Sequence, residues 1–563
     1  MHEERVTCMD YRELYEIWTK NCGGALRGEL LAIAADEKDI EDRFYKHLEF
    51  GTGGLRGKLG AGTNRMNVYT VRRATAGLAD YLLAEFGASA SVAIAHDSRN
   101  GSVEFSREAA CVFAAKGVRV FTYSELMPTP MLSFAVRQLK CSGGIVITAS
   151  HNPAVYNGYK VYGADGCQIT NAAADAIYAR ICEYDDPFAV PAADFDSAVA
   201  EGKITFIGDD VIKAYDDAVF ACSTGVDGGG LKIVYTPLNG AGNKPVRRVL
   251  ARAGFTDVSV VPEQENPDGD FPTCTYPNPE EAAALALAVE KAQREGADLV
   301  LATDPDSDRV GSAVPDGKGG FTLINGNQMG VLLIDYILTR REESGAMPQR
   351  PEIVTTIVST PMAQPIAADH GATVKELLTG FKYIGEEIGR LEAAGEADRY
   401  VFGFEESYGY LPGPYVRDKD AVVASLLICE MTAFYKKQGK SLLDRLAELY
   451  EKYGYYRETL KTFVFEGISG KAQMDAIIAR LAKEGITLHE GEAPLAKDYS
   501  AGIEGLPPSK VLSFTDSKAR LTVRPSGTEP KLKVYVSAKA PSAEAADAEA
   551  AAVLAKVQAL IEA

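Results

Sequence analysis

Residues 145–153 read IVITASHNP, an apolar run followed at once by a small polar loop. The run Ile145–Ile147 is typical of a buried strand, and the hexapeptide TASHNP places Ser150 directly after it. Open α/β sheets carry their chemistry at the carboxyl ends of strands, which makes Ser150 a candidate nucleophile. A single serine in a loop is most often an ordinary turn residue, so other parts of the chain must decide between these interpretations.

Segments of strand and helix character alternate on both sides of this loop. VAIAHDSR (92–99) and VRVFTY (118–123) precede it, with a helical stretch between them. The alternation recurs with KIVYTPLNG (232–240) and ADLVLATDPDSDR (297–309), and a third time between about 322 and 450. This order predicts repeated βαβ units and an α/β fold built on parallel sheets.

The chain is too long for a single core, and its pattern predicts four domains. The predicted domains are residues 1–205, which include an N-terminal helical extension, 206–320, 321–453 and 454–563. The first three are α/β in character. The last contains the strand-like runs KTFVFEGI, ARLTVRPSG and KLKVYVSA with helices between and after them, which predicts a separate α+β domain.

Composition and charge exclude several classes of protein. With 78 acidic against 59 basic residues, the net charge of −19 disfavours nucleic acid and anionic membranes as partners. The start MHEERVTCMD is acidic and unlike a secretory signal, and the most apolar helical stretch, 421–435, is too short to span a bilayer. Nine scattered cysteines without a Cys-x-x-Cys pair predict reduced thiols and a cytoplasmic protein.

Three aspartates stand in the loop DPDSDR, directly after an apolar strand-like run. Asp304, Asp306 and Asp308 repel one another, and a hard divalent cation such as Mg²⁺ relieves that repulsion. An EF-hand is excluded, because Arg309 and Pro315 occupy the positions of its glycine and its last glutamate. A phosphatase with an aspartate nucleophile and a solvated acidic turn remain alternatives.

The loop RPSGTEPKLKVY in the last domain offers groups that suit a phosphate. Its arginine presents a planar fork of donors, its hydroxyls can donate as well, and its glycine lets backbone N–H groups come close. A plain hairpin turn is equally compatible with this loop by itself. The groups concerned are Arg524, Ser526, Gly527 and Thr528.

Two further loops contain candidate binding groups. GFEESYGY (403–410) presents Glu405 and Ser407, which suit hydrogen bonding to vicinal sugar hydroxyls. A glycosidase pair is the competing interpretation, but neighbouring glutamates would point in different directions. In GTGGLRG (51–57), Arg56 is the functional candidate. The chain contains neither a GxxxxGK[ST] motif nor a GxSxG motif, which argues against a nucleoside triphosphatase and an α/β-hydrolase.

Together, TASHNP, DPDSDR, GFEES and RPSGTEPK resemble, in this order and spacing, the four active-site loops of the α-D-phosphohexomutases. The resemblance covers essentially the whole chain. LEFGTGGLRG (48–57), PDGDFPTCTYPNPE (267–280) and TGFKYIGEEI (379–388) resemble the longer phosphoglucomutase and phosphopentomutase branch of that family. The family implies three similar α/β domains and a smaller α+β domain around a central cleft.

The resemblance also implies roles for individual residues. Ser150 would carry the phosphoryl group, and Mg²⁺ would be held by a phosphoryl oxygen on Ser150 together with the three aspartates of DPDSDR. Lys160 and Arg56 would lie near the transferred group, with Lys160 favoured as the proton shuttle, while His151 would either transfer a proton or support the loop. The substrate would be bound by Arg309, Thr379, Lys382, Glu405, Ser407, Arg524, Ser526, Gly527 and Thr528.

The expected reaction is the interconversion of glucose 1-phosphate and glucose 6-phosphate through a phosphoserine and glucose 1,6-bisphosphate. The same chemistry on mannose or pentose phosphates remains open, as do an aspartate phosphatase and a non-catalytic sugar-phosphate binder. The expected partners are small sugar phosphates, for a monomer or a homodimer. A hinge near residues 453–457 would close the cleft over the substrate.

Overall fold

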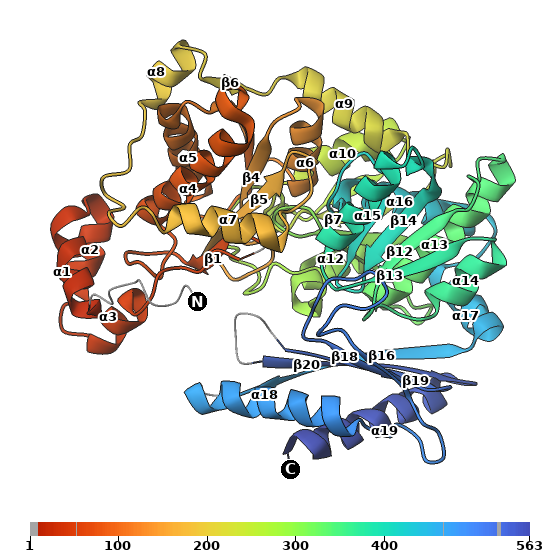
Figure 1. Ribbon diagram of the computed structural model, residues 1–563. Helices are drawn as coiled ribbons and strands as arrows, with labels where there is room; N and C mark the ends of the chain where they lie inside the picture. The colour runs from red at the N-terminus through yellow and green to blue at the C-terminus, as the bar shows by residue number, and fades with distance from the viewer. Residues whose placement is uncertain (1–9, 52, 466, 526–530, 563) are drawn as a thin grey trace. The chain divides into compact units, whose positions relative to one another are not determined.

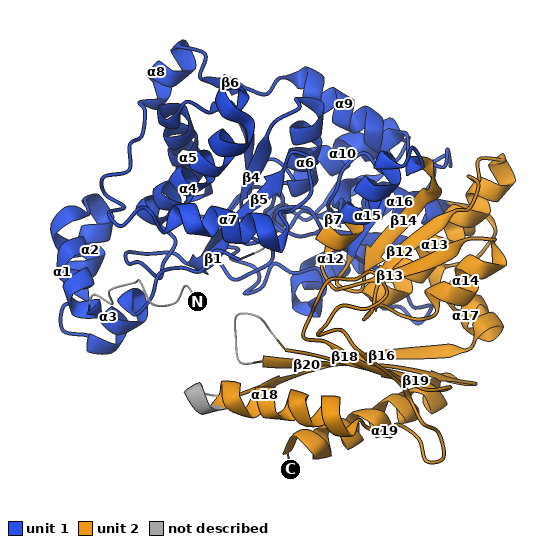
Figure 2. Ribbon diagram, in the orientation of Figure 1, with its two compact units in different colours: residues 1–323, 385–397, 409–433 blue, residues 324–384, 398–408, 434–563 orange. Residues whose placement is uncertain are grey.

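The computed structural model of the protein describes residues 10–51, 53–465, 467–525 and 531–562. The chain forms two compact units, each assembled from several segments (Figure 2). The first unit contains residues 1–323, 385–397 and 409–433, and the second contains residues 324–384, 398–408 and 434–563.

Three short helices open the first unit, as the helical N-terminal pattern predicted. They are α1 (Tyr11–Asn21), α2 (Gly24–Ala32) and α3 (Glu37–Phe44). Trp18 is buried, and its ring lies 5.9 Å from the ring of Phe44 and 5.2 Å from the ring of Phe188. Phe188 lies in a later segment of the first α/β domain, so the single tryptophan packs the helical extension against that domain.

The first sheet has the strand order β1-β5-β4-β2-β3-β6. Strands β2, β3, β4 and β6 are parallel, whereas β5 runs antiparallel to both β4 and β1. Strands β2 and β4 are buried along their whole length, as expected for strands covered on both faces. The strands are β1 (Leu55–Lys58), β2 (Ser91–His96), β3 (Arg119–Thr122), β4 (Gly143–Ile147), β5 (Tyr156–Gly163) and β6 (Ile204–Phe206).

Helices flank this sheet, and α5 and α6 pack directly on its central strands (Figure 1). Asn67 forms a capping box with Thr70 at the start of α4, so the first helix after the extension has a defined beginning. The helices and turns are α4 (Val68–Phe86), η1 (Gly87–Ser89), α5 (Ser102–Lys116), α6 (Thr129–Gln138), α7 (Asn171–Ile181) and α8 (Phe195–Ala200).

The second sheet has the order β11-β10-β9-β7-β8 and also lies in the first unit. Strands β7, β8 and β9 are parallel, and β10 returns antiparallel to β9 after the aspartate loop. Its strands are β7 (Ile233–Thr236), β8 (Val258–Val260), β9 (Leu299–Thr303), β10 (Val310–Pro315) and β11 (Phe321–Ile324). Its helices are α9 (Asp209–Phe220), α10 (Asn243–Arg252), α11 (Pro262–Glu265) and α12 (Ala282–Glu295).

The third sheet is built around β12, which pairs in parallel with β13 and with β14 in the second unit. Asn325 caps α13 through a capping box with Gln328. The strands of this part of the chain are β12 (Glu352–Thr356), β13 (Thr373–Leu377), β14 (Tyr400–Glu405) and β15 (Gly409–Pro412). The helices are α13 (Gly326–Ser344), α14 (Ala363–Asp369), α15 (Phe381–Ala393), η2 (Ala397–Arg399), α16 (Ala421–Lys437) and α17 (Leu442–Tyr453).

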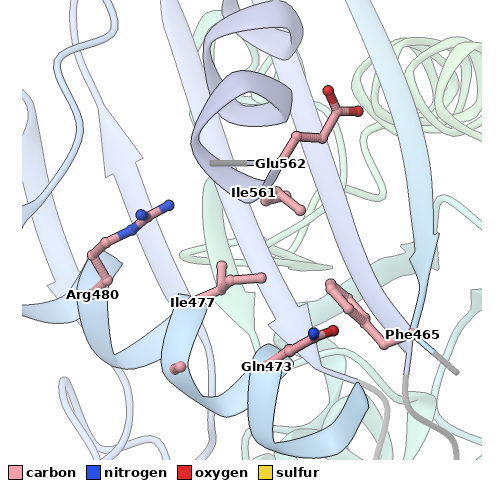
Figure 3. A pocket seen from close by; sticks show the side chains of 7 residues that line it. Phe465, Gln473, Ile477, Arg480, Ile561 and Glu562 are labelled. Carbon is pink, nitrogen blue, oxygen red and sulfur yellow. The ribbon is translucent and has the colours of Figure 1, made fainter. Parts of the chain in front are cut away.

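The fourth sheet is antiparallel, with the order β16-β20-β19-β18-β17, and α18 and α19 cover one of its faces (Figure 1). Its elements are β16 (Tyr455–Val464), α18 (Gly467–Glu484), β17 (Leu495–Asp498), β18 (Leu512–Thr515), β19 (Ala519–Pro525), β20 (Lys531–Ala540) and α19 (Ala543–Glu562). A groove of about 470 Å³ lies beside the two helices. Figure 3 shows side chains that line it, among them Phe465, Gln473, Ile477, Arg480, Ile561 and Glu562.

The predicted α/β class with a C-terminal α+β region is confirmed by these four sheets. The four domain boundaries stay predictions. Within the described ranges, none of the helices combines the length and the apolar composition that crossing a membrane requires.

Candidate functional site

Ser150 lies in the loop between β4 and β5, at the carboxyl end of β4. Its φ of 51° is in the left-handed region, and its N–H donates to Thr148 Oγ1 over 2.8 Å. Its side chain is buried, and its Oγ donates to Asp304 Oδ2 over 2.8 Å. The serine of TASHNP and the first aspartate of DPDSDR therefore meet, although they follow strands of two different sheets.

The three aspartates of DPDSDR lie together in the loop between β9 and β10. One carboxylate oxygen from each of Asp304, Asp306 and Asp308 lies within 4.8 Å of the others, and all three side chains are buried. The Oδ1 atoms of Asp306 and Asp308 accept no hydrogen bond within the described part of the chain. Buried oxygens of this kind are the donors that a hard divalent cation prefers, so the loop fits the predicted metal.

Electrostatics in the loop support the same conclusion. Burial raises the pKa of Asp304 well above its usual range, and the charges of Asp306 and Asp308 raise it further. Burial also opposes ionisation of Asp308, but Lys160, Lys419 and Arg309 outweigh it and hold the pKa of that carboxyl well below its usual range. A cation bound at this loop would offset the free-energy cost of ionising Asp304.

Lys160 reaches these carboxylates from β5. Its Nζ lies 2.7 Å from Asp306 Oδ2 and 3.1 Å from Asp308 Oδ2. Burial lowers the pKa of the ammonium group, but Asp306 and Asp308 outweigh burial and raise it. In this arrangement Lys160 is a cation, which makes it an electrostatic partner of the loop.

Two contacts with the aspartates were missed from the sequence. Lys419 Nζ lies 3.1 Å from Asp308 Oδ2. Thr129, at the start of α6, donates its Oγ1 proton to Asp306 Oδ2 over 2.8 Å. The run RDKD at 417–420 is buried although all four of its residues are charged, but in the sequence alone such a run is typical of an exposed loop.

His151 and Arg56 also lie at the serine loop. His151 Nδ1 is 3.2 Å from Ser150 Oγ. Burial and the positive charges of Arg309 and Arg56 hold the pKa of His151 well below its usual value of 6.5, so the imidazole is neutral near pH 7. Arg56 Nη1 donates to Asn152 Oδ1 over 3.4 Å.

The guanidinium group of Arg309 is directed only partly toward the aspartate loop. Its Nη1 pairs with Glu280 Oε1 at 3.0 Å, while its Nε lies 3.7 Å from Asp308 Oδ1. Glu280 is the last residue of the stretch PDGDFPTCTYPNPE, so its contact with Arg309 brings the end of that stretch to the site. An incoming phosphate would compete with Glu280 for the guanidinium group.

The second unit holds the other predicted groups. Glu405 ends β14 and is buried, and its Oε1 accepts a hydrogen bond of 2.8 Å from the N–H of Gly380. The adjacent Glu406 accepts from Thr356 Oγ1 over 3.3 Å. The two glutamates thus contact different groups, in agreement with the argument against a glycosidase pair. The Oγ1 of Thr379 is buried and makes no hydrogen bond to the described residues, which leaves it available to a ligand.

The remaining predicted groups of the second unit lie on two elements. Lys382, in the first turn of α15, has its Nζ 4.9 Å from the ring of Tyr383. Arg524 stands near the end of β19. It neighbours Tyr535, whose pKa is raised to about 12 by burial and then by Glu406, while Arg524 opposes that rise. Ser526, Gly527 and Thr528 lie outside the described residues.

The four domain models of the phosphoglucomutase/phosphomannomutase family match successive parts of the chain. Its alpha/beta/alpha domains I, II and III match residues 47–187, 213–318 and 325–453, and its C-terminal domain matches residues 471–556.

Curated relatives and solved structures are similar as well. A phosphoglucomutase of Staphylococcus aureus (strain USA300) is 35% identical over 544 residues, which are 94% of this chain and 96% of the relative. A phosphoglucomutase of Staphylococcus haemolyticus is 36% identical over 88% of this chain and 91% of its own length. A putative phosphomannomutase from Thermus thermophilus has the same fold, with a TM-score of 0.69 and 24% identity over 92% of this chain and 100% of that one.

Proposed function

This chain belongs to the phosphoglucomutase/phosphomannomutase family, and on that premise we propose that it interconverts α-D-glucose 1-phosphate and glucose 6-phosphate. The observation that carries the proposal is the 2.8 Å hydrogen bond between Ser150 Oγ and Asp304 Oδ2, since Asp304 is one of three clustered buried carboxylates. A serine in this position is suited to carry a phosphoryl group beside a cation site. The Staphylococcus relatives named phosphoglucomutases support glucose as the sugar.

We propose that Ser150 is phosphorylated before the substrate arrives. A hydroxyl oxygen of the sugar monophosphate attacks the phosphorus, and the bond between the phosphorus and the serine oxygen breaks. The hydroxyl proton passes to a base, and the serine oxygen takes up a proton to become a hydroxyl again. The sugar bisphosphate then turns over and returns its other phosphoryl group to Ser150, so that no phosphate is lost. Phosphoryl transfer has a loose transition state, so the protein contributes mainly position and charge.

The charges of the site support specific roles. Lys160 is a cation in this arrangement and would neutralise charge beside the transferred group. His151 is neutral and its Nδ1 lies 3.2 Å from Ser150 Oγ, so we propose His151 as the proton acceptor. Lys160, favoured from the sequence as the proton shuttle, already carries its proton and would act as a proton donor. Arg56 and Arg309 would bind phosphate oxygens.

The aspartate loop fits a divalent cation, and we propose Mg²⁺. Asp304, Asp306 and Asp308 would hold it together with an oxygen of the phosphoryl group. When bound, the ion would neutralise negative charge on that group. Glucose 1,6-bisphosphate would be both the intermediate and the activator that loads Ser150.

The groups of the second unit would bind the sugar and its second phosphate. Glu405 and Ser407 would accept and donate hydrogen bonds to the sugar hydroxyls, with Thr379 and Lys382 beside them. Arg524, Ser526, Gly527 and Thr528 would hold the phosphate that is not transferred. We further propose the four predicted domains, a cytoplasmic location, and a monomer or a homodimer. Nine scattered cysteines without a Cys-x-x-Cys pair support the location.

A coupled assay tests the proposal directly. The purified protein is given Mg²⁺, a trace of glucose 1,6-bisphosphate, and in turn glucose, mannose and ribose 1-phosphates. We expect isomerisation without release of phosphate, fastest with glucose, and its loss in S150A. Phosphate release that survives S150A would support the aspartate phosphatase instead, and a faster reaction with mannose or ribose phosphate would replace glucose as the substrate.

A further inference from the structure

Arg99 donates five hydrogen bonds to backbone carbonyls in and beside the Ser150 loop, and no sequence motif pointed to it. It follows β2 in the run VAIAHDSR, and its side chain is fully buried. The guanidinium group donates to the Ser150 carbonyl from Nη2 over 2.5 Å and from Nε over 3.2 Å. It also donates to the carbonyl of Asn152, to that of Pro153 over 3.0 Å and to that of Tyr156 over 3.1 Å.

These contacts fall on the backbone that fixes the direction of the serine. Ser150 adopts a φ of 51°, which is unfavourable for a residue with a side chain and persists only when its surroundings enforce it. Holding the carbonyls on both sides of His151 prevents the peptide planes from rotating. The Ser150 Oγ therefore keeps its direction toward Asp304.

Arg99 is itself held on two sides. Asp97 lies at the end of β2, and its Oδ2 is 3.4 Å from Arg99 Nε, while its Oδ1 accepts from the N–H of Arg99 over 2.9 Å and from Ser102 Oγ over 2.7 Å. The ring of Phe271 covers the guanidinium group, with its centroid 4.9 Å from Arg99 Cζ. A buried arginine with a carboxylate on one side and a ring on another has little freedom to move.

Phe271 comes from the second sheet's domain, in the stretch PDGDF at 267–271. A Cβ on Gly269 would stand 2.4 Å from the backbone nitrogen of Asn100, so this stretch packs directly against the chain beside Arg99. Asn100 Nδ2 also donates to Asp270 Oδ1 over 2.7 Å. The same domain contains the aspartate loop. Through Phe271, the domain with the candidate metal ligands therefore also contacts Arg99, which holds the Ser150 loop.

From these contacts we infer that Arg99 is a positioning residue for phosphoryl transfer, seated by Phe271, which sets the direction of Ser150 toward the aspartate loop. The inference rests on the proposed function, because positioning matters only if Ser150 carries a phosphoryl group. A lysine at position 99 keeps the charge but cannot span four carbonyls, since it lacks the planar fork of donors. A misplacement of about 1 Å can cost a reaction about 100-fold in rate.

The test compares R99K with R107K. Arg107 is the matched control, because it stacks on Phe195 with its Cζ 4.2 Å from the ring centroid in the same domain and was assigned no role at the site. We expect R99K to lower kcat by about 100-fold with KM for glucose 1-phosphate within about twofold, and R107K to leave both unchanged. Hydrogen exchange at the amides of residues 148–152 should be faster in R99K alone.

The outcomes separate this inference from the proposed function. If the wild-type protein isomerises glucose 1-phosphate and R99K does so equally well, the positioning role is wrong and the function stands. If the wild-type protein is no mutase, exchange still reports on the loop, and equal exchange in R99K and the wild type would overturn the structural role. Should R99K fail to fold, F271L decides: a several-fold lower kcat supports the inference and an unchanged kcat overturns it.

Discussion

Ser150 and Asp304 share a hydrogen bond of 2.8 Å although they lie 154 positions apart in the chain. The contact joins the carboxyl end of β4 to the carboxyl end of β9, and thus two separate sheets. It is the point where the candidate phosphate carrier meets the candidate metal ligands. Both strands are buried along their length, so this meeting point is held by two packed cores.

The first prediction concerns metal affinity. D306N removes one of three clustered carboxylates, and we expect affinity for Mn²⁺, used as a spectroscopic substitute for Mg²⁺, to fall at least about 10-fold. Titration followed by electron paramagnetic resonance measures it. D257N is the control, because Asp257 is an exposed aspartate of the same sheet's domain. Equal affinity in D306N and D257N would remove the aspartate loop as the metal site.

The second prediction concerns the protonation of His151. Burial and the charges of Arg309 and Arg56 hold its pKa well below 6.5, so the ring should stay neutral from pH 6 to pH 8. Nuclear magnetic resonance of the ring protons in S150A, which carries no phosphoserine, measures this without a phosphate charge nearby. A midpoint near 6.5 would show that the ring is solvated and would withdraw it as the neutral proton acceptor.

The third prediction concerns the sugar loop. A Cβ on Gly326, the first residue of α13, would stand 1.9 Å from the backbone oxygen of Glu406, which cannot yield without moving the loop GFEES. We expect G326A to destabilise the protein by about 1–3 kcal/mol and to raise KM for glucose 1-phosphate. Denaturant unfolding and steady-state kinetics measure the two effects.

The matched control for this prediction is G389A in α15. A Cβ on Gly389 would meet no atom within 4 Å, and alanine is the better helix former. G389A should therefore be neutral or stabilising by up to about 1 kcal/mol, with KM unchanged. If G326A behaved like G389A, the close approach of α13 to the sugar loop would be unimportant.

The fourth prediction concerns stability against pH. His489 Nδ1 lies 2.6 Å from Asp516 Oδ2 and its Nε2 contacts Glu549; although burial lowers its pKa, these two partners raise it above 6.5. A raised pKa means that the imidazolium stabilises the fold fully below pH 6.5, and that this stabilisation is lost as pH rises through the folded-state pKa. Scanning calorimetry should show that the Tm of the second unit falls as the pH rises through the folded-state pKa of His489. The fall in Tm should be smaller in H489Q than in the wild type. An equal fall in the two proteins would contradict the pairing of His489 with Asp516 and Glu549.

Much of the fold was predictable because its signals are local. The apolar runs before TASHNP and DPDSDR became β4 and β9, since a strand buried on both faces needs a continuous apolar sequence. The positions of Ser150 and the three aspartates followed from the same pattern, because each loop comes directly after its strand. The N-terminal extension was predicted as helical, but its division into three helices depends on packing around Trp18.

The order of amino acids was enough to predict the candidate site residues and the strand end that each of them follows. Folding brings Lys419 beside Asp308, lets Arg99 span four carbonyls in and beside the serine loop, and keeps His151 neutral, and none of these could be predicted from the sequence. The reason is physical: strand and turn preferences act between neighbours, whereas a salt bridge or a pKa shift depends on burial and on charges brought together from distant parts of the chain.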